Sequence, residues 1–208
     1  MELLDIHTHN STAHSRLAIL NCSTYTPERT ISLGLHPWYA PTEWRETFAT
    51  IEQCASNSNV AAIGECGIDA LRSTLPIEEQ KALLRAHALL AERVQKPLIL
   101  HCVKAFDAIV ALHKEISPKQ VWIIHGFRGK PQQATLLTKR GLCLSFGEKF
   151  NKESLMATPA EKLFIESDDS SQSIATIYST IAAAMGTTVE ELARQTMENS
   201  HLIGQFRE

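Results

Sequence analysis

The stretch Val60-Ala61-Ala62-Ile63-Gly64-Glu65 decides our prediction of the fold. It is a short run of small and branched apolar residues that ends at one ionisable side chain. Runs of this kind are typical of parallel β-strands that are buried on both faces. Because catalytic groups of parallel α/β folds gather at the carboxyl ends of the strands, Glu65 is predicted to lie at the functional edge.

Four further runs have the same form, since each is short, apolar and ends at histidine or aspartate. They are Leu-Leu-Asp-Ile-His-Thr-His (3–9), Pro-Leu-Ile-Leu-His (97–101), Val-Trp-Ile-Ile-His (121–125) and Leu-Phe-Ile-Glu-Ser-Asp (163–168). If all five runs are neighbouring strands, their last residues meet at one rim. The sequence therefore predicts a cluster of imidazole and carboxylate groups there.

Apolar runs and helical patterns alternate along the whole chain. The predicted strands cover residues 3–9, 17–22, 30–36, 60–65, 97–102, 121–125, 142–146 and 163–167. The predicted helices cover residues 43–56, 76–95, 107–116, 131–140, 152–160 and 173–185, with a last helix that starts after a Thr188 cap. This order indicates an α/β protein with a single domain over residues 1–208, folded as a distorted (β/α)8, or TIM, barrel. The connections 10–16 and 23–29 are too short for crossover helices, so reduced helices are expected after the first two strands.

Composition narrows the class of protein and of partner. Of the 208 residues, 44% are hydrophobic and 21% charged, which is typical of a globular domain. The net charge of −3 gives no sign of the broad basic face that tight duplex binding requires. No stretch is apolar enough to cross a bilayer and the N-terminus lacks a signal-peptide pattern, so we expect a cytoplasmic protein without membrane contact. The five scattered cysteines argue against a disulfide framework.

The polar strand ends have the chemistry of a catalytic metal site. His7 and His9 are two residues apart on a predicted strand, so both side chains can face one ion. A His-x-His pair alone is more often incidental, but His101, His125 and Asp168 recur at equivalent positions. Histidine and carboxylate ligands fit one or two divalent ions, and Zn, Mn, Mg, Ni and Fe all remain open. Glu65 is the expected bridge between two ions, one held by His7 and His9 and the other by His101 and His125. Asp168 is the expected general base toward a water that the metal acidifies.

Several motifs together resemble the TatD family of metal-dependent deoxyribonucleases, within the amidohydrolase-like superfamily. They are Asp-Ile-His-Thr-His (5–9), Gly-Leu-His-Pro-Trp (34–38), Ile-Gly-Glu-Cys-Gly-Ile-Asp (63–69), Lys-Pro-Leu-Ile-Leu-His (96–101), Ile-Ile-His-Gly-Phe-Arg-Gly (123–129) and Glu-Ser-Asp (166–168). Each piece is weak alone, but the set follows the order of the family along nearly the whole chain.

The resemblance implies a distorted TIM barrel that hydrolyses phosphodiester bonds, usually in DNA and often from a 3′ end. It implies that the metal ligands are His7, His9, Glu65, His101, His125 and Asp168. Asp168, Glu65 and His36 are then the catalytic residues, and His36 corresponds to a family histidine near the substrate phosphate. His36, Lys104 and Arg128 are our candidates for contacts with the substrate, expected to be single-stranded DNA or its 3′ ends.

One departure from the family concerns the substrate. The family commonly has arginine two residues after the histidine of the fifth strand, where this chain has Val103 followed by Lys104. Losing a guanidinium removes a bidentate phosphate clamp. An alternative is therefore an amidohydrolase-type enzyme for an ester, amide or phosphoester of a small molecule. A third hypothesis is a metal-binding protein without catalytic turnover. The presence of Asp168, the expected general base, argues against it. The oligomeric state is left open.

Overall fold

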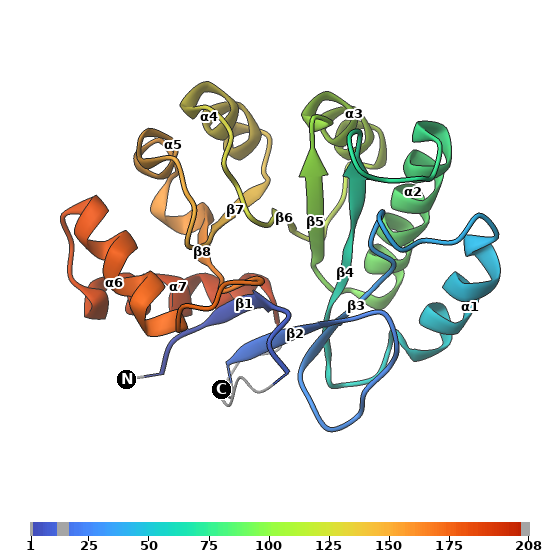
Figure 1. Cartoon of the computed structure of the whole chain (residues 1–208), viewed down its shortest axis with the longest axis horizontal. Helices are drawn as coiled ribbons and strands as arrows, with labels where there is room; N and C mark the ends of the chain where they lie inside the picture. The colour runs from blue at the N-terminus through green and yellow to red at the C-terminus, as the bar shows by residue number, and fades with distance from the viewer. Residues whose placement is uncertain (1, 12–16, 205–208) are drawn as a thin grey trace. The chain divides into compact units, whose positions relative to one another are not determined.

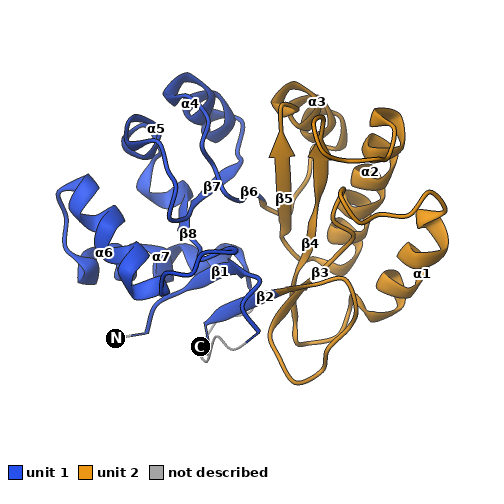
Figure 2. Ribbon diagram, in the orientation of Figure 1, with its two compact units in different colours: residues 1–20, 123–208 blue, residues 21–122 orange. Residues whose placement is uncertain are grey.

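The chain forms two compact units in the computed structural model, which describes residues 2–11 and 17–204. Unit 1 comprises Met1–Leu20 and Ile123–Glu208, and unit 2 comprises Asn21–Trp122 (Figure 2). Strands β2 (Ala18–Cys22) and β6 (Trp122–Ile124) each have residues in both units. The single domain expected over residues 1–208 stays a prediction.

Unit 2 is built on parallel strands that follow one another in chain order. They are the end of β2, then β3 (Ile31–Leu33), β4 (Val60–Asp69) and β5 (Leu98–Val103). All ten residues of β4 are buried, as expected for a parallel strand with both faces covered. The helices are α1 (Trp44–Cys54), α2 (Ile77–Val94) and α3 (Phe106–Ile116), with α2 packed on β4 and α3 on α2 and β5 (Figure 1).

Two glycines let β4 and β5 lie unusually close where the polar residues begin. A Cβ atom on Gly67 would lie 1.9 Å from the carbonyl oxygen of His101, and one on Gly64 would lie 2.4 Å from that of Ile99. Both glycines also have positive φ angles, +131° at Gly64 and +145° at Gly67, which other residues rarely adopt. These positions therefore require glycine, and they bring Glu65 next to His101.

A buried histidine connects α2 to the segment that follows β3. The Nε2 atom of His87 accepts a hydrogen bond from the backbone N–H of Leu35 at 3.0 Å, and its Nδ1 lies 2.9 Å from the carbonyl oxygen of Leu83. The ring is therefore neutral, with its proton on Nδ1. Burial lowers the pKa of His87 to about 4, because the charged ring would lose its hydration. From the sequence, His87 is expected to be a surface or helix residue; it does lie on a helix, but the structure buries it completely.

Unit 1 contains the first and the last strands side by side. Its strands are β1 (Asp5–Thr8), the start of β2, most of β6, β7 (Cys143–Phe146) and β8 (Leu163–Ile165). β1 pairs in parallel with β2, β6 with β7 and β7 with β8. A parallel bridge between Thr8 and Asp168 joins the end of β1 to the segment after β8. Together with unit 2, this is the strand succession of a (β/α)8 barrel, so the predicted α/β class is confirmed.

Buried polar groups fasten this junction of β1 and β8. Asp5 accepts hydrogen bonds from the backbone N–H of Ser167 at 2.9 Å and from its Oγ at 2.6 Å. Burial raises the pKa of Asp5 to about 7, even though the bonds from Ser167 oppose that rise. The hydroxyl of Tyr178 donates to the carbonyl oxygen of Leu4 at 2.8 Å, which ties a helix to the same strand.

The helices of unit 1 are α4 (Pro131–Lys139), α5 (Lys152–Met156), α6 (Ile174–Met185) and α7 (Val189–Asn199). The predicted cap of the last helix is confirmed, since Thr188 Oγ1 accepts from the backbone N–H of Glu191 and Glu191 reaches back to Thr188. The helix predicted over residues 152–160 is too long. It ends at Met156, and a 3₁₀ turn, Ala160–Lys162, follows Pro159, whose ring cannot continue a helix.

The strands differ from the prediction mainly in length. The third, expected over residues 30–36, is only Ile31–Leu33, because the N–H of Leu35 bonds to His87 instead of a strand. The fourth, expected to stop at residue 65, continues to Asp69, which pairs with Val103. No helix lies between β2 and β3, as predicted. The connection between β1 and β2 includes residues 12–16, which lie outside the described residues.

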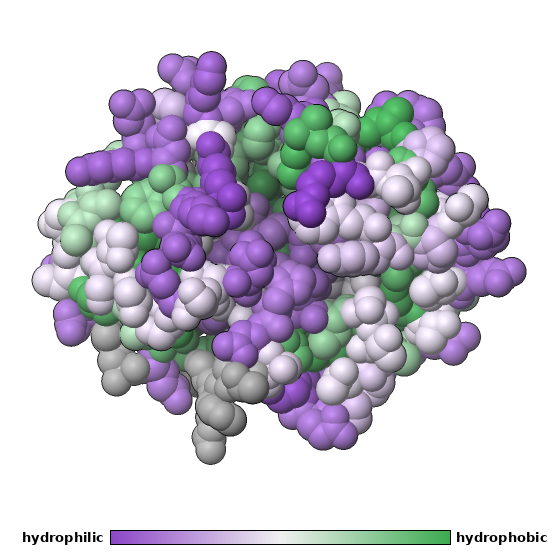
Figure 3. Space-filling view, in the orientation of Figure 1, coloured by the Kyte–Doolittle hydropathy of each residue, from purple (hydrophilic) through white to green (hydrophobic). Residues whose placement is uncertain are grey.

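Among the described residues, none of the helices combines the length and the apolar character that a membrane span requires. On the face drawn in Figure 3, hydrophobic residues reach the surface only in separated patches. Within residues 2–11 and 17–204, the exposed large hydrophobic side chains are Tyr39, Leu71, Ile77, Leu89, Leu136 and Met156.

The burial of His87 predicts an acid-sensitive step in stability. Its folded pKa of about 4 lies below the value of about 6.5 expected in the unfolded chain, so the unfolded state binds the proton first. The contribution of His87 is present above pH 6.5 and is lost as the pH falls toward 4. Between pH 7.5 and pH 5 this residue should cost about 2 kcal/mol of the free energy of unfolding.

The measurement is urea denaturation of the wild type and of His87→Gln at both pH values. Glutamine keeps a donor and an acceptor but cannot be protonated, so the variant should lose about 2 kcal/mol less than the wild type on acidification. Equal losses in the two proteins would contradict the assignment.

Candidate metal centre

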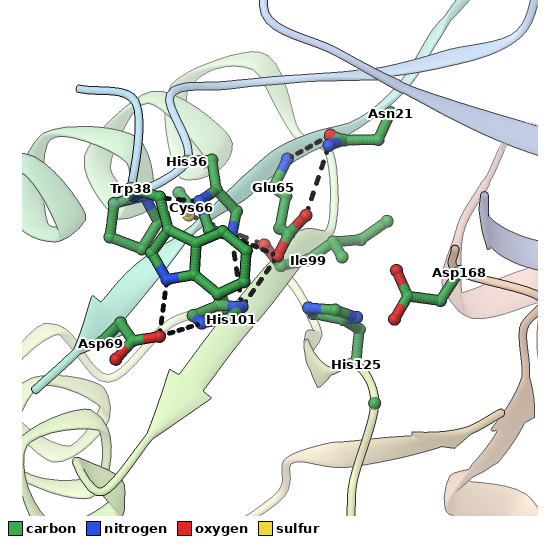
Figure 4. Close-up of polar contacts among 12 residues, drawn as sticks. Asn21, His36, Trp38, Glu65, Cys66, Asp69, Ile99, His101, His125 and Asp168 are labelled. Atoms are coloured by element: carbon green, nitrogen blue, oxygen red, sulfur yellow. Dashed lines mark hydrogen bonds and ion pairs between the residues drawn. The ribbon is translucent and has the colours of Figure 1, made fainter. Parts of the chain in front are cut away.

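Three buried side chains of unit 2 bring their ligand atoms together. Glu65 Oε1 lies 3.0 Å from His36 Nε2 and 3.0 Å from His101 Nδ1, and the two nitrogens are 3.3 Å apart (Figure 4). Glu65 comes from β4, His101 from β5, and His36 from the turn after β3. This group of His36, Glu65 and His101 has the donor set that binds Zn²⁺ and related divalent ions.

The hydrogen bonds around the histidines indicate how this group fits a cation. His101 Nε2 lies 3.0 Å from the carboxylate of Asp69, so in the neutral ring it carries the proton. The Nδ1 lone pair of His101 then points at the Glu65 oxygen, and two lone pairs that face each other repel. A divalent cation among these atoms removes the repulsion, because both lone pairs become ligands. The residues present therefore fit a metal ion.

Asp69 fixes the orientation of His101 from the outer side. Its carboxylate also accepts hydrogen bonds from Trp38 Nε1 at 2.6 Å and from the backbone N–H groups of Leu71 and Arg72. Burial acts to raise the pKa of Asp69, but the bonds from His101, Trp38 and the two amides outweigh it and lower the pKa to about 2. Asp69 is therefore ionised at neutral pH and selects the tautomer of His101 that offers Nδ1 to a metal.

Asn21, the last residue but one of β2, holds Glu65 at two points. Its Oδ1 accepts from the backbone N–H of Glu65 at 2.9 Å, and its Nδ2 donates to Glu65 Oε2 at 3.3 Å. Ser32 Oγ lies 3.4 Å from the same Oδ1 and supports the amide. The second carboxylate oxygen of Glu65 is thus occupied by Asn21, while Oε1 faces the two histidines (Figure 4).

The second group lies in unit 1, at the junction of β1 and β8. Asp168 Oδ1 lies 3.8 Å from His7 Nε2 and 3.6 Å from His9 Nε2, and the rings of His7 and His125 are 4.3 Å apart between centroids. The N–H of Asp168 donates to the carbonyl of His7, and the N–H of His9 donates to the carbonyl of Asp168. These backbone bonds place the side chains. His7, His125 and Asp168 have ligand atoms within 4.8 Å of one another.

The separations in this group suit ligands of a shared ion better than direct hydrogen bonds. Two ligands that each lie about 2.1 Å from a tetrahedral zinc ion are roughly 3.4 Å apart. The distances of 3.6 and 3.8 Å from Asp168 to the two histidines are near that value and too long for a hydrogen bond. These side chains also fit a metal ion.

Glu166 lies behind His125, as Asp69 lies behind His101. Its Oε1 is 3.3 Å from His125 Nδ1 and accepts from the backbone N–H of Gly126 at 2.6 Å. Burial acts to raise the pKa of Glu166, but the neighbouring His125 and His7 outweigh it, so the pKa lies below its usual value. His125 therefore has a carboxylate partner for Nδ1 and keeps Nε2 for the ligand group.

The candidate contacts for substrate are all at the surface or in turns. Arg128 is exposed and lines a pocket with Asp168, Lys149 and Ser170. Lys104 is exposed and follows the end of β5 with a positive φ of 55°. Val103, in the position where the family commonly has arginine, pairs with Asp69 in the sheet and is half-buried.

The sequence predicts the residues of both groups, but two contacts that the structure shows were not expected. His36, expected at the substrate, lies with its Nε2 beside Glu65 Oε1 and His101 Nδ1, and its contact with the substrate stays a prediction. Asn21 is not among the predicted site residues, although it lies near the end of a predicted strand, as the expected ligands do. Cysteine is absent from the ligand groups of the described residues, and all five thiols are free.

The Asn21 clamp predicts a stability effect in the metal-free protein. Asn21→Ala leaves the N–H of Glu65 without its acceptor and should lower the free energy of unfolding by about 1–2 kcal/mol. Asn21→Asp should cost more at pH 7, because it sets a second carboxylate against Glu65. Asn57→Ala, which removes an exposed side-chain hydrogen bond to the carbonyl oxygen of Cys54, is the control. It should change the free energy of unfolding by less than about 0.5 kcal/mol. Denaturant unfolding measures all three, and an Asn21→Ala variant as stable as the control would refute the clamp.

Comparison with protein families matches residues 4–203 to the family described as TatD related DNase. Among curated proteins, the chain is 32% identical over 145 residues to a protein of Pantoea sp. (strain At-9b) named 3′-5′ ssDNA/RNA exonuclease TatD, which covers 65% of this chain and 55% of that protein. It is 30% identical over 190 residues to the uncharacterized metal-dependent hydrolase YabD of Bacillus subtilis, covering 81% of this chain and 74% of YabD. The match thus spans little more than half the length of the Pantoea protein.

Solved structures show the same fold at low identity. The TatD homologue YJJV of Escherichia coli K12 superposes with a TM-score of 0.80 at 20% identity, over 97% of each chain. A TatD family hydrolase of Entamoeba histolytica gives a TM-score of 0.75 at 15% identity, over 98% of each chain. At these identities the comparison concerns the fold alone, and it agrees with the (β/α)8 topology.

Proposed function

Because this chain belongs to the family of TatD-related DNases, we propose that it is a metal-dependent hydrolase that cleaves phosphodiester bonds of single-stranded DNA. The observation that carries the proposal is that each unit assembles its own group of side chains that could hold a metal ion, His36, Glu65 and His101 in one and His7, His125 and Asp168 in the other. Core packing does not require such groups, because buried ionisable side chains are costly without a counter-charge.

The proposed metal ligands are His7, His9, His125 and Asp168 for one ion, and Glu65 and His101 for another. His36 lies in the same group, but its Nδ1 accepts from the backbone N–H of Trp38, so in the neutral ring Nε2 carries the proton and donates to Glu65. A divalent cation supplies the charge that polarises a phosphoryl oxygen and acidifies a water molecule. The convergence of both groups on one rim stays a prediction. The identity of the ion also stays open, since mixed nitrogen and oxygen ligands accept several divalent metals.

Asp168 is the proposed general base. It is partly exposed, with a side chain 21% accessible, whereas Glu65 and Glu166 are almost fully buried. A carboxylate that both water and the ligand histidines can reach is suited to accept a proton from an attacking water. Glu65 is held by Asn21 and is suited to a ligand role, because its position is fixed before substrate arrives.

Single-stranded DNA is the proposed substrate, as the name of the Pantoea relative suggests for that protein. Arg128 and Lys149 line the pocket beside Asp168 and supply positive charge for a phosphate next to the base. His36 and Lys104 remain proposed contacts on the side of unit 2. With free cysteines at all five positions, we also keep the proposal of a cytoplasmic protein.

A small phosphoester or ester is the second candidate substrate. Val103 stands where the family commonly has arginine, and it is half-buried in the sheet, so no guanidinium is available there. Weaker phosphate binding would relax the preference for a polynucleotide. Cleavage of a generic phosphodiester without cleavage of DNA would favour this reading.

The first test is hydrolysis of a single-stranded oligonucleotide with Mn²⁺, with a chelator and by Asp168→Asn. The chelator should abolish cleavage, and Asp168→Asn should lower kcat by about 100-fold or more, since proton transfer loses its acceptor. Glu190→Gln, an exposed acid of α7, is the matched control and should retain full activity. Cleavage that survives both the chelator and Asp168→Asn would disprove the proposed mechanism.

The second test concerns the support of His101 by Asp69. Asp69→Asn keeps an acceptor for the amides of Leu71 and Arg72 but weakens the hold on His101, so the affinity for a divalent ion should fall by about 10–100-fold. Isothermal titration calorimetry with Zn²⁺ measures this directly. Asp107→Asn, an exposed acid in the first turn of α3, should bind the metal like the wild type. Equal affinities in Asp69→Asn and the control would show that Asp69 plays no part in metal binding.

A further inference from the structure

One aromatic side chain of unit 2, that of Tyr39, is largely exposed beside the ligand group. The side chain of Tyr39 is 75% accessible, although its ring lies only 5.4 Å from that of His36. Exposing a large ring next to a polar centre gains nothing for folding, because burial of aromatic area is what stabilises a protein. The position points to a ligand that covers the ring when it binds.

The backbone around Tyr39 is held firmly by His36. The N–H groups of Tyr39 and Ala40 both donate to the carbonyl oxygen of His36 at 3.0 Å, and the N–H of Trp38 donates to His36 Nδ1 at 3.0 Å. Ser73 Oγ bonds to the carbonyl of Pro37 at 2.6 Å and ties the neighbouring loop to this turn. Tyr39 is therefore presented from a fixed backbone, which limits the entropy lost when a ligand stacks on it.

Trp38 and Arg72 extend the surface next to Tyr39. The guanidinium carbon of Arg72 lies 3.8 Å above the ring of Trp38, and Trp38 Nε1 is bound to Asp69. The rings of Trp38 and Tyr39 are 6.2 Å apart and nearly perpendicular. An exposed ring, a fixed indole and a cation together match one kind of ligand, namely a flat base attached to an anionic backbone.

We propose that Tyr39, Trp38 and Arg72 form an aromatic ledge on which a base of single-stranded nucleic acid stacks, with Arg72 facing the adjoining phosphate. The inference rests on the proposed function, since it names how that substrate is held. Tyr39 supplies the stacking face, and Trp38 is the support that positions Arg72. Because every base has a flat face, the ledge binds single strands with little preference for sequence.

The test is binding of a fluorescein-labelled single-stranded oligodeoxynucleotide to the full chain carrying Asp168→Asn, with Mn²⁺ present, followed by fluorescence anisotropy. On this background, Tyr39→Ala should weaken binding about tenfold, and Tyr39→Trp should bind within about twofold because it keeps an aromatic face. Leu89→Ala, which removes another exposed apolar side chain of unit 2, is the matched control and should not change the affinity. Arg72→Gln should weaken binding. It should also reduce by about one the slope of the logarithm of the binding constant against the logarithm of the salt concentration.

A second series identifies the partner of Tyr39. An abasic residue is placed in turn at each of the last nucleotides at either end of the oligonucleotide. At one position, removal of the base should weaken binding to the protein that has Tyr39 but should not weaken binding to Tyr39→Ala. This is expected for a base and a side chain that contact each other. Equal affinities of Tyr39→Ala and Leu89→Ala would overturn the ledge. The ledge would also be overturned if, at every abasic position, the loss of affinity from the missing base and the loss from Tyr39→Ala were additive.

The outcome for the ledge is separable from the outcome for the proposed function. Hydrolysis of bis(p-nitrophenyl) phosphate and of DNA by the metal-loaded wild type tests the chemistry, whereas the Asp168→Asn background tests binding alone. Cleavage by the wild type together with unchanged binding by Tyr39→Ala would refute only the ledge. A change in oligomeric state on Tyr39→Ala, without a change in affinity, would also refute it and would assign the ring to a subunit contact.

Discussion

The close approach of β4 and β5 is the constraint on which the unit 2 site depends. Gly64 and Gly67 have no side chain where a Cβ atom would meet the carbonyls of Ile99 and His101. The strands can therefore pair past Glu65 as far as Asp69, which puts a carboxylate on each side of His101. Any larger residue would push β5 away and separate Glu65 from its histidine partners.

Unit 1 reaches a similar arrangement by a different device. The backbone bridge between Thr8 and Asp168 brings the two ends of the chain's strand order together, and Asp5 fastens it through Ser167. In both units an outer carboxylate holds a histidine of the candidate ligand group, Asp69 for His101 and Glu166 for His125. In both units this pairing determines which ring nitrogen of the histidine faces the other side chains of its group. The histidine by itself does not determine this.

The buried ionisable groups also explain why the proposed metal suits the fold. Glu65, His101 and His7 lie almost wholly out of water, where uncompensated charge and facing lone pairs are unfavourable. Asn21 Nδ2 donates a hydrogen bond to Glu65 Oε2, while Oε1 faces the two histidines. A divalent cation would supply positive charge to both groups. The exposed Tyr39 beside one group then has a physical reason, since the substrate that reaches the metal can also cover the ring.

The sequence by itself determined the α/β class, the strand order and the identities of the ligand-type residues, because each of these follows from short apolar runs that end in histidine or acid. It also predicted the missing helix between β2 and β3 and the cap at Thr188. Only the tertiary structure decided that His36 joins Glu65 and His101, that Asn21 grips Glu65, and that His87 is buried. These contacts join residues far apart in the chain, such as Asn21 and Glu65, and no local period or propensity records which distant side chains meet.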